Sequence, residues 1–282
     1  MIRLCAFADE ASAPLEGQIA ALVRNGISLL ELRSIDGTNV KDITFREAEE
    51  YKKSLDKAGI SVFSIGSPIG KSKIDDDIEV LKREANHVFS LANIFGAKNI
   101  RMFSFFEAYE KEDEVISRLT LLTELAKEYG LTLCHENEKE IYGDTPERVA
   151  RILNSVDGLK SVFDPANYIQ VGLSADEFLP MSKSAEYFHI KDVVAETGEL
   201  VPAGYGNGKL PELIAALPSD AVVTVEPHLA VFDGYASIDN TEMKHRFNFA
   251  SNDEAFDTAV KALKDIFKKL GYSERDGGFI KV

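Results

Sequence analysis

The feature that most constrains the fold is an eightfold alternation of short apolar runs with longer stretches of helical periodicity. The apolar runs are rich in β-branched and aromatic residues and have the lengths of buried strands. The candidate strands are Ile2–Phe7, Leu29–Arg33, Ser61–Gly66, Asn99–Ser104, Leu131–Asn137, Ser161–Asp164, Tyr187–Asp192 and Val222–Glu226. Because a helix or a loop follows each strand, the pattern predicts a parallel sheet joined by crossovers.

The stretches between the candidate strands are amphipathic, as expected of helices that cover a sheet. They include LEGQIAALVRNG, FREAEEYKKSLDKAG, DIEVLKREANHVFSLANIFG and EVISRLTLLTELAKEYG. Each of these four ends in a glycine, which favours the left-handed conformation that closes a helix before the next strand. The segment Asp144–Glu147 predicts the start of a further helix, since its proline is tolerated in a first turn.

A closed (β/α)8 TIM barrel and an open doubly wound sheet both accommodate eight such strands. The barrel is favoured because no glycine-rich phosphate loop follows the first strand, and because polar residues end many strands rather than one or two. We therefore predict a single α/β domain over residues 1–282. Within it, residues 232–282 are expected to form a late polar loop, a final helix over Asp253–Leu270 and a tail that packs under the barrel or mediates assembly.

The composition argues against several classes of partner. The net charge of −15 and the pI near 4.9 disfavour binding to nucleic acid, which needs clustered basic residues. No stretch approaches the ~20 apolar residues that a membrane span requires.

Cys5 and Cys134 lie in apolar runs without CxxC spacing, so we expect buried free thiols and a reducing compartment. The N-terminus reaches acidic residues too soon for a signal peptide, and we expect a cytoplasmic protein.

Four ionisable residues close the last four candidate strands. They are Glu136, Asp164, His189 and Glu226, spaced by 28, 25 and 37 residues, about one strand–helix unit each. Since parallel strands end at the same mouth of a barrel, these side chains should converge there. Three carboxylates and one imidazole suit Mn²⁺, Mg²⁺, Co²⁺ or Zn²⁺, and a divalent cation relieves the repulsion among the acids. We predict one bound divalent metal ion, with Mn²⁺ expected.

Basic residues at the same mouth are candidates for substrate binding. Lys191 shares a strand face with His189, and Arg33 shares one with Glu31, because side chains alternate along a strand. A salt bridge to a nearby carboxylate is the alternative role for both. Lys71 follows the third strand in a loop of proline and glycine, where it would offer a positive charge to a carboxylate or phosphate.

Other residues near the predicted ligands are candidates for supporting contacts. His228 lies two residues beyond Glu226, where it could contact the substrate or brace a ligand, and Glu138 lies two beyond Glu136, where it could brace a ligand. His135 should face away from the mouth by alternation, and we expect a core histidine there. An apolar wall against a sugar, or core packing, is expected of Phe103, Phe105 and Phe106.

These motifs resemble the xylose isomerase-like barrels of the sugar phosphate isomerase/epimerase family, which includes D-tagatose 3-epimerase and hydroxypyruvate isomerase. The resemblance covers most of the chain. It rests on Glu136-Asn137, on Asp164 with Asn167 three residues later, on the HxKD sequence of residues 189–192, on the loop of residues 202–206, and on Glu226. Two residues depart from the family: Asn167 stands where ketose epimerases have histidine, and Tyr205 stands where relatives usually have glutamate.

The resemblance implies roles for individual residues. Glu136 and Glu226 would be both metal ligands and the acid/base pair, while Asn137 and Asn167 would contact the substrate. Together with the metal, they would move a proton α to a carbonyl of a sugar or sugar derivative through an enediolate, as an isomerase or an epimerase.

Three other functions remain open. The same site could act as a lyase on 3-keto-glycosides by β-elimination, or a non-catalytic barrel could bind a polyol. Hydrolysis of a phosphodiester is disfavoured by the negative charge. The expected partner is a small carbohydrate, and the chain is expected to form a homo-oligomer, a dimer or a tetramer.

Overall fold

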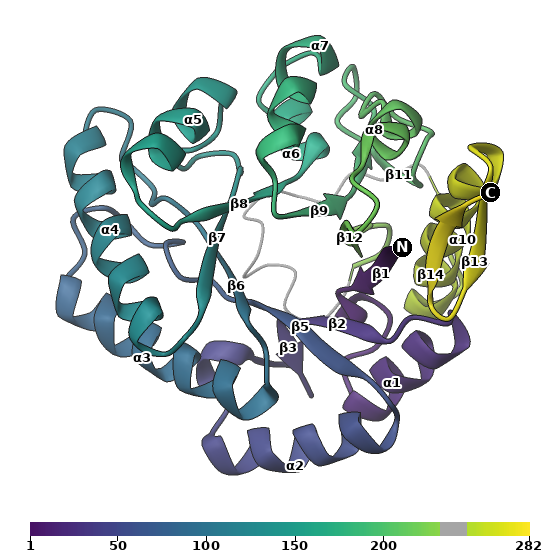
Figure 1. The fold of residues 1–282 in the computed structure, drawn as a ribbon, viewed down its shortest axis with the longest axis horizontal. Helices are drawn as coiled ribbons and strands as arrows, with labels where there is room; N and C mark the ends of the chain where they lie inside the picture. Colours follow the sequence, from purple (N-terminus) through teal and green to yellow (C-terminus); the bar gives the residue numbers. More distant parts are fainter. Residues whose placement is uncertain (232–246) are drawn as a thin grey trace.

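A computed structural model describes residues 1–231 and 247–282, and in it eight parallel strands close into a barrel (Figure 1). Each strand pairs with the next along the chain, and the last pairs with the first through Leu4↔Val223 and its neighbours. The strands are β1 Ile2–Ala6, β2 Leu29–Leu32, β5 Ser61–Gly66, β6 Asn99–Met102, β7 Thr132–Glu136, β8 Lys160–Phe163, β9 Tyr187–Ile190 and β12 Val222–Val225. The predicted (β/α)8 barrel is therefore confirmed, and the open doubly wound sheet is excluded.

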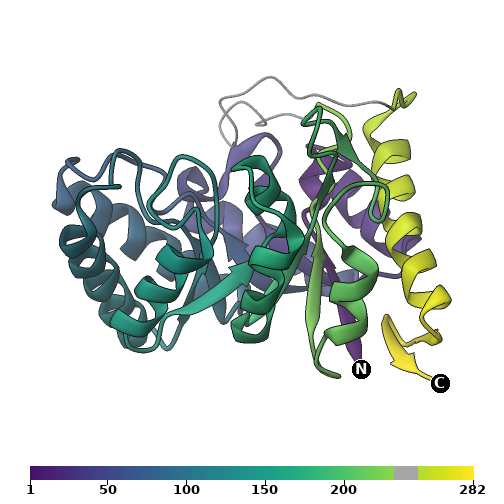
Figure 2. The same cartoon turned by 90° about the horizontal axis from the view of Figure 1, so that it is seen from above.

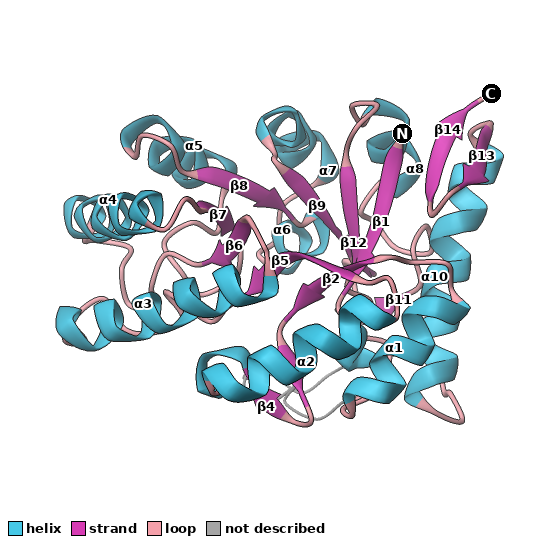
Figure 3. Ribbon diagram, turned by 60° about the horizontal axis from the view of Figure 1, so that its bottom comes forward, coloured by secondary structure: helices cyan, strands magenta, loops and turns pink. Residues whose placement is uncertain are grey.

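Helices lie outside the strand ring (Figure 3). They are α1 Leu15–Arg24, α2 Phe45–Lys57, α3 Ile78–Phe95, α4 Glu112–Glu128, α5 Pro146–Ser155, α6 Pro165–Gln170, α7 Ala175–Phe178, α8 Leu210–Ala216 and α10 Asn252–Lys269. Gly96 ends α3 with a φ of +75°, and its N–H donates to the carbonyls of Ala92 and Asn93. That is the left-handed closure that the sequence predicts. The final helix begins and ends within one residue of its predicted bounds.

Short elements lie in the connections between the barrel strands and the helices. A two-residue hairpin, β3 Ser34–Ile35 and β4 Thr38–Asn39, follows β2, and a second, β10 Asp192–Val193 and β11 Leu200–Val201, follows β9. The 3₁₀ turns are η1 Ala8–Glu10, η2 Val40–Asp42 and η3 Leu179–Ser184. The predicted late loop lies outside the described residues over 232–246. Among the described residues, no helix is long and apolar enough to cross a bilayer.

The tail forms an antiparallel hairpin at the amino end of the barrel. Its strands are β13 Tyr272–Arg275 and β14 Gly278–Lys281, and β14 pairs with the start of β1 through Ile2↔Phe279. Phe279 is buried and stacks on Phe267 of α10 at 4.3 Å between ring centroids. Figure 2 shows both chain termini at this end. Of the two expectations for the tail, packing beneath the barrel is what the fold shows.

The barrel interior is filled in layers, because every second residue of a strand points inward. The layer near the amino ends is apolar and contains Cys5, Leu29, Cys134, Val162, Tyr187 and Val222. Both cysteines are buried and free, as expected. The layers above it are polar and carry the residues of the candidate site. A hydrophobic floor therefore separates that site from the amino end of the barrel.

Candidate metal centre

The four predicted metal ligands converge in the barrel mouth. Glu136 ends β7 and His189 lies in β9, while Asp164 and Glu226 directly follow β8 and β12. One ligand atom from each residue lies within 4.8 Å of the others. All four side chains are at most 2% exposed. The spacing of one strand–helix unit thus produces the cluster, since ring closure places the ends of consecutive strands side by side.

Hydrogen bonds orient the histidine among the acids. Nδ1 of His189 lies 2.9 Å from Oε1 of Glu136 and 2.9 Å from Oε2 of Glu226. Its other ring nitrogen, Nε2, lies 3.1 Å from Oε2 of Glu31, which also accepts from the Thr224 hydroxyl at 2.9 Å. Glu31 accepts the Tyr187 hydroxyl on Oε1 at 2.7 Å. A carboxylate on the outer nitrogen of a histidine is the usual brace for a metal ligand.

Two buried carboxylate oxygens of the cluster lack hydrogen-bond partners among the described residues: Oδ2 of Asp164 and Oε2 of Glu226. Lys191 Nζ and His189 Nδ1 approach them to 2.9 Å as ion pairs, without hydrogen-bond geometry. Oxygens left in this state normally accept a hydrogen bond or a cation. Together with an imidazole nitrogen, they form the donor set that Mn²⁺, Mg²⁺ or Zn²⁺ accepts. The residues present therefore fit a divalent metal.

The cluster attracts positive charge. Burial raises the pKa of Glu136, but His189 and Arg101 outweigh it and hold that pKa at about 2. The pKa of Glu226 also lies well below its usual range, because Lys191 and His189 overcome the effect of burial. Burial lowers the pKa of His189, yet Glu136 and Glu31 raise it well above its usual range. A protonated histidine thus supplies charge that a bound metal would replace.

Asp164 differs from the two glutamates. Burial raises the pKa of its carboxyl to about 7, against the lowering effect of the Lys191 ammonium. Its Oδ1 accepts the backbone N–H groups of Ala166 and Asn167 at 2.8 and 3.2 Å, so Asp164 also caps α6. The cap fixes the carboxylate and leaves Oδ2 directed toward the cluster.

The remaining predicted contact residues lie around the cluster. Asn137 bonds the backbone of Asp164 through both amide atoms, at 2.8 and 2.9 Å. Asn167 donates to the carbonyl of Asn137 at 2.9 Å and to Oε1 of Glu136 at 3.4 Å. Both asparagines therefore hold ligands in place, and their contact with substrate remains a prediction. Lys191 makes the ion pair with Asp164 that was its alternative role.

Arg33 joins the first and last strands of the barrel. Its guanidinium forms a bidentate ion pair with the Asp9 carboxylate, with both hydrogen bonds at 2.9 Å. It also donates to Oε1 of Glu226 at 3.1 Å. Glu10 accepts the backbone N–H of His228 at 2.7 Å, and burial raises the pKa of Glu10 to about 8. Sequence reasoning missed Asp9 and Glu10, although their position directly after the first strand was a usable signal.

Arg101 is a further site residue that sequence reasoning missed. It points inward from β6, is 4% exposed, and donates to Oε2 of Glu136 at 3.0 Å. A charged residue inside the apolar run NIRMF was the available signal. On the same side of the mouth, Lys71 pairs with Glu138 at 3.2 Å and lies over the ring of Phe103 at 4.5 Å.

Two residues near the proposed ligands, His135 and Asp192, have structural roles. His135 faces outward and bonds the Ser104 hydroxyl at 2.9 Å, as expected of a core histidine. In the HxKD motif, Asp192 accepts three backbone N–H groups of the following loop, those of Gly204, Gly206 and Gly208, at 2.9 to 3.0 Å. A Cβ at position 206 would lie 2.3 Å from Oδ1 of Asp192, so glycine is required there. Tyr205, in the same loop, is exposed.

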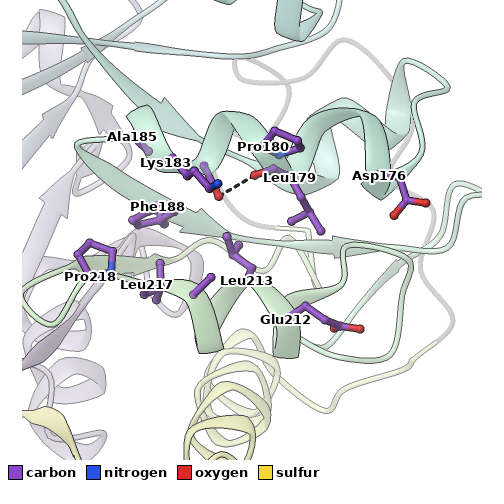
Figure 4. Close-up of a pocket in the computed structure, with 12 residues that line it drawn as sticks. Asp176, Leu179, Pro180, Lys183, Ala185, Phe188, Glu212, Leu213, Leu217 and Pro218 are labelled. Atoms are coloured by element: carbon purple, nitrogen blue, oxygen red, sulfur yellow. Dashed lines mark hydrogen bonds between the residues drawn. The ribbon is translucent and has the colours of Figure 1, made fainter.

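A separate groove of about 590 Å³ lies on the outer wall of the barrel (Figure 4). Its walls come from η3 and α8, and its floor includes Phe188 of β9. Apolar side chains such as Leu179 and Leu213 line it, with Lys183 and Glu212 at its edges. None of the predicted site residues lines this groove, so it is distinct from the metal centre.

The sequence profile described as xylose isomerase-like TIM barrel matches residues 19–230. The chain belongs to this family. No curated protein sequence matches it significantly. Three solved structures illustrate the likeness within the xylose isomerase-like family. An L-ribulose 3-epimerase is 18% identical, with a TM-score of 0.72 over 95% of this chain and 97% of that one.

The second is the IolI protein with a bound zinc atom, which is 17% identical, with a TM-score of 0.72 over 95% of this chain and 99% of that one. The third, a probable 3-DHS dehydratase, AsbF, from Bacillus anthracis, is 18% identical, with a TM-score of 0.70 over 94% of this chain and 99% of that one. At such identities the structures establish the shared fold.

Proposed function

We propose that the chain is a divalent-metal-dependent isomerase or epimerase that moves a proton α to a carbonyl of a sugar or sugar derivative through an enediolate. The observation that carries the proposal is the convergence of the Glu136 and Glu226 carboxylates on one buried cluster with Asp164 and His189. Their placement at the carboxyl ends of strands is where barrel enzymes hold their catalytic groups.

Glu136, Asp164, His189 and Glu226 would hold the metal, for which Mn²⁺ is our first choice and Mg²⁺, Co²⁺ or Zn²⁺ the alternatives. When bound, such an ion acts as a Lewis acid that polarises a carbonyl oxygen. The zinc atom named for the similar IolI structure supports the proposal that this chain binds a divalent ion.

Glu136 and Glu226 would carry the proton. They come from β7 and from the end of β12, strands that lie on either side of β9 in the sheet order, so they would approach a substrate from two directions. Removal by one and return by the other on the opposite face inverts a carbon, whereas return to the neighbouring carbon by one group interconverts aldose and ketose. Arg101 and Arg33 each hold one oxygen of one glutamate and so keep both carboxylates oriented.

The proposed substrate is a small carbohydrate, held by residues that surround the metal ligands. We assign substrate contacts to Lys191, Asn167, Lys71, Arg33, His228 and Asn137. We further propose that the protein is cytoplasmic and forms a homo-oligomer.

A lyase reaction is the second candidate, because one similar structure is named a probable dehydratase. Removal of the same α-proton followed by loss of a β-oxygen substituent would release the leaving group of a 3-keto-glycoside. Removal of the α-proton is common to the isomerase and the lyase. The two reactions differ in the next step, because only the lyase expels the β-oxygen substituent.

The test is deuterium incorporation. Mn²⁺-loaded protein is incubated with ketoses, inososes and 3-keto-glycosides in D₂O, and NMR follows exchange α to the carbonyl. We expect exchange that Glu136→Gln and Glu226→Gln each lower by about 10²–10⁴-fold, the usual contribution of general acid–base catalysis. The NMR spectra of the products distinguish the two reactions, because an isomerase gives an isomer of the substrate whereas a lyase releases a fragment. Exchange at the wild-type rate in both variants would contradict the assigned roles, and no turnover of any compound would favour a polyol-binding barrel.

A further inference from the structure

We propose that a recess at the barrel mouth binds a carboxylate of the substrate, so that the enzyme acts on an acidic sugar derivative; this inference rests on the proposed function. Three cationic side chains line the recess: Arg33, Lys71 and Arg101. Phe103 and Gly66 form part of its wall.

Two aromatic rings join the cations into one row. The guanidinium of Arg33 lies 4.3 Å from the ring centroid of Phe7, and that of Arg101 lies 5.2 Å from the same centroid. Arg101 also lies 4.7 Å from the centroid of Phe103, over which Lys71 Nζ lies at 4.5 Å. The rings stabilise the cations without neutralising them. Each of the three cations also forms an ion pair with a carboxylate, Lys71 with Glu138 at 3.2 Å, so the row brings three cationic groups to the recess without giving it a net positive charge.

Fewer carboxylates contact the Arg101 guanidinium than contact that of Arg33. Whereas Asp9, Glu10 and Glu226 all contact Arg33, Arg101 forms its ion pair with Glu136, and its Nε has no hydrogen-bond partner among the described residues. A buried guanidinium with unused donors is costly.

Glu136 is also a proposed metal ligand, so its negative charge would be shared with a divalent ion. Metal loading then leaves the Arg101 guanidinium with less compensating charge than it has in the metal-free site. A substrate carboxylate supplies both the missing charge and two acceptor oxygens.

The size and place of the recess favour a carboxylate at the end of the substrate. The free space in the recess is about that of one water-sized group, so only the end of a substrate could enter it. Arginine donors also match the carboxylate plane. Since Arg33 and Arg101 contact Glu226 and Glu136, a group in the recess lies next to the residues that would move the proton.

Calorimetric titration of Mn²⁺-loaded protein tests the recess without requiring turnover. The ligands are D-fructose, D-fructuronate and D-fructose 6-phosphate, and the corresponding three forms of D-tagatose, which differ at C6 alone. We expect each uronate to bind at least about tenfold more tightly than its parent ketose, as a charge-assisted contact predicts. Arg101→Gln should remove this preference, and Lys71→Gln should reduce it, with bound manganese measured in each variant.

Lys73→Gln is the matched control, because Lys73 is a lysine of the same loop but is 59% exposed and pairs with Glu107. It should leave the preference unchanged. Equal affinity for ketose and uronate in both sugars, or tighter binding of the phosphates, would overturn the proposal, as would a preference that persists in both the Arg101 and Lys71 variants. Uronate binding without deuterium exchange would support the recess while contradicting the proposed reaction.

Discussion

At the scale of single residues, the candidate site depends on how each carboxylate is compensated. Glu136 and Glu226 keep a low pKa because positive groups contact them, whereas Asp164 is buried beside one ammonium and its pKa rises to about 7. The carboxylates of Glu136 and Glu31 raise the pKa of His189 well above its usual range and so favour its protonated form. The metal-free cluster therefore holds protons that a cation must displace.

The first prediction is that Mn²⁺ binds more tightly as the pH rises from about 5 to about 8. Asp164, with a pKa of about 7, and His189, with a pKa raised above its usual range, must both lose a proton before they can coordinate. Binding therefore releases protons, and affinity increases with pH. Titration calorimetry in buffers of different ionisation enthalpy measures the number released; a pH-independent affinity would contradict the protonated state of the cluster.

The second prediction concerns Glu31, which receives hydrogen bonds from Tyr187 and Thr224 and contacts the outer nitrogen of His189. Glu31→Gln should weaken Mn²⁺ binding by about 10–100-fold, as loss of such a brace usually does. Equilibrium dialysis measures the affinity. Glu47→Gln, an exposed helix-capping residue of α2, is the control and should leave the affinity unchanged.

At the scale of elements, the loop after β5 is fixed by close backbone contact with the end of β6. Phe103 donates its N–H to the carbonyl of Ile69 at 2.8 Å, and Phe105 donates to that of Gly70 at 2.9 Å. Gly70 has a φ of +84°, and a Cβ there would lie 2.1 Å from the carbonyl oxygen of Phe103. The glycine therefore sets where Lys71 enters the mouth.

The third prediction compares two glycines of positive φ. Gly37 has a φ of +76°, but a Cβ added there would meet open space, so Gly37→Ala should cost about 1–2 kcal/mol of unfolding free energy, for the left-handed backbone alone. Gly70→Ala should cost more, because the backbone of Phe103 cannot move aside cheaply. Urea unfolding measures both variants, and equal losses would show that the contact is not tight.

At the scale of the whole molecule, a stabilising hairpin and the candidate metal centre lie at opposite ends of the barrel. The hairpin of β13 and β14 extends the sheet at the amino ends, where Phe279 packs on Phe267. The candidate metal centre lies beyond the apolar layer, at the carboxyl ends. A substitution in the hairpin should therefore change folding without changing the site.

The fourth prediction is that Phe279→Ala lowers the unfolding free energy by about 3–5 kcal/mol, the usual cost of removing a buried aromatic ring. Mn²⁺ affinity of the folded protein should stay the same. Ile280→Ala, on the same strand but 43% exposed, is the control and should have a small effect. A loss of metal affinity in Phe279→Ala would show that the two ends are coupled.

Much of this protein was predictable from local patterns. Alternating apolar runs and glycine-terminated helices determined the eight strands and their crossovers, because these signals depend on residues close in sequence. The set Glu136, Asp164, His189 and Glu226 followed from the same pattern, since each residue lies at or next to the carboxyl end of a strand. The clustering of the four needed no more than the closure of the barrel.

Tertiary structure decided which groups surround those ligands. Closure brings β1 and η1 beside β12, so Arg33 contacts Asp9 and Glu10 and also Glu226, which lies 193 residues further along the chain. Arg101 meets Glu136 only because β6 and β7 are neighbours in register. The periodicity of apolar residues in the sequence does not predict such contacts, because the partners lie far apart along the chain. The clustering of the four proposed metal ligands was therefore predictable from sequence, whereas the charges that compensate them depend on the fold.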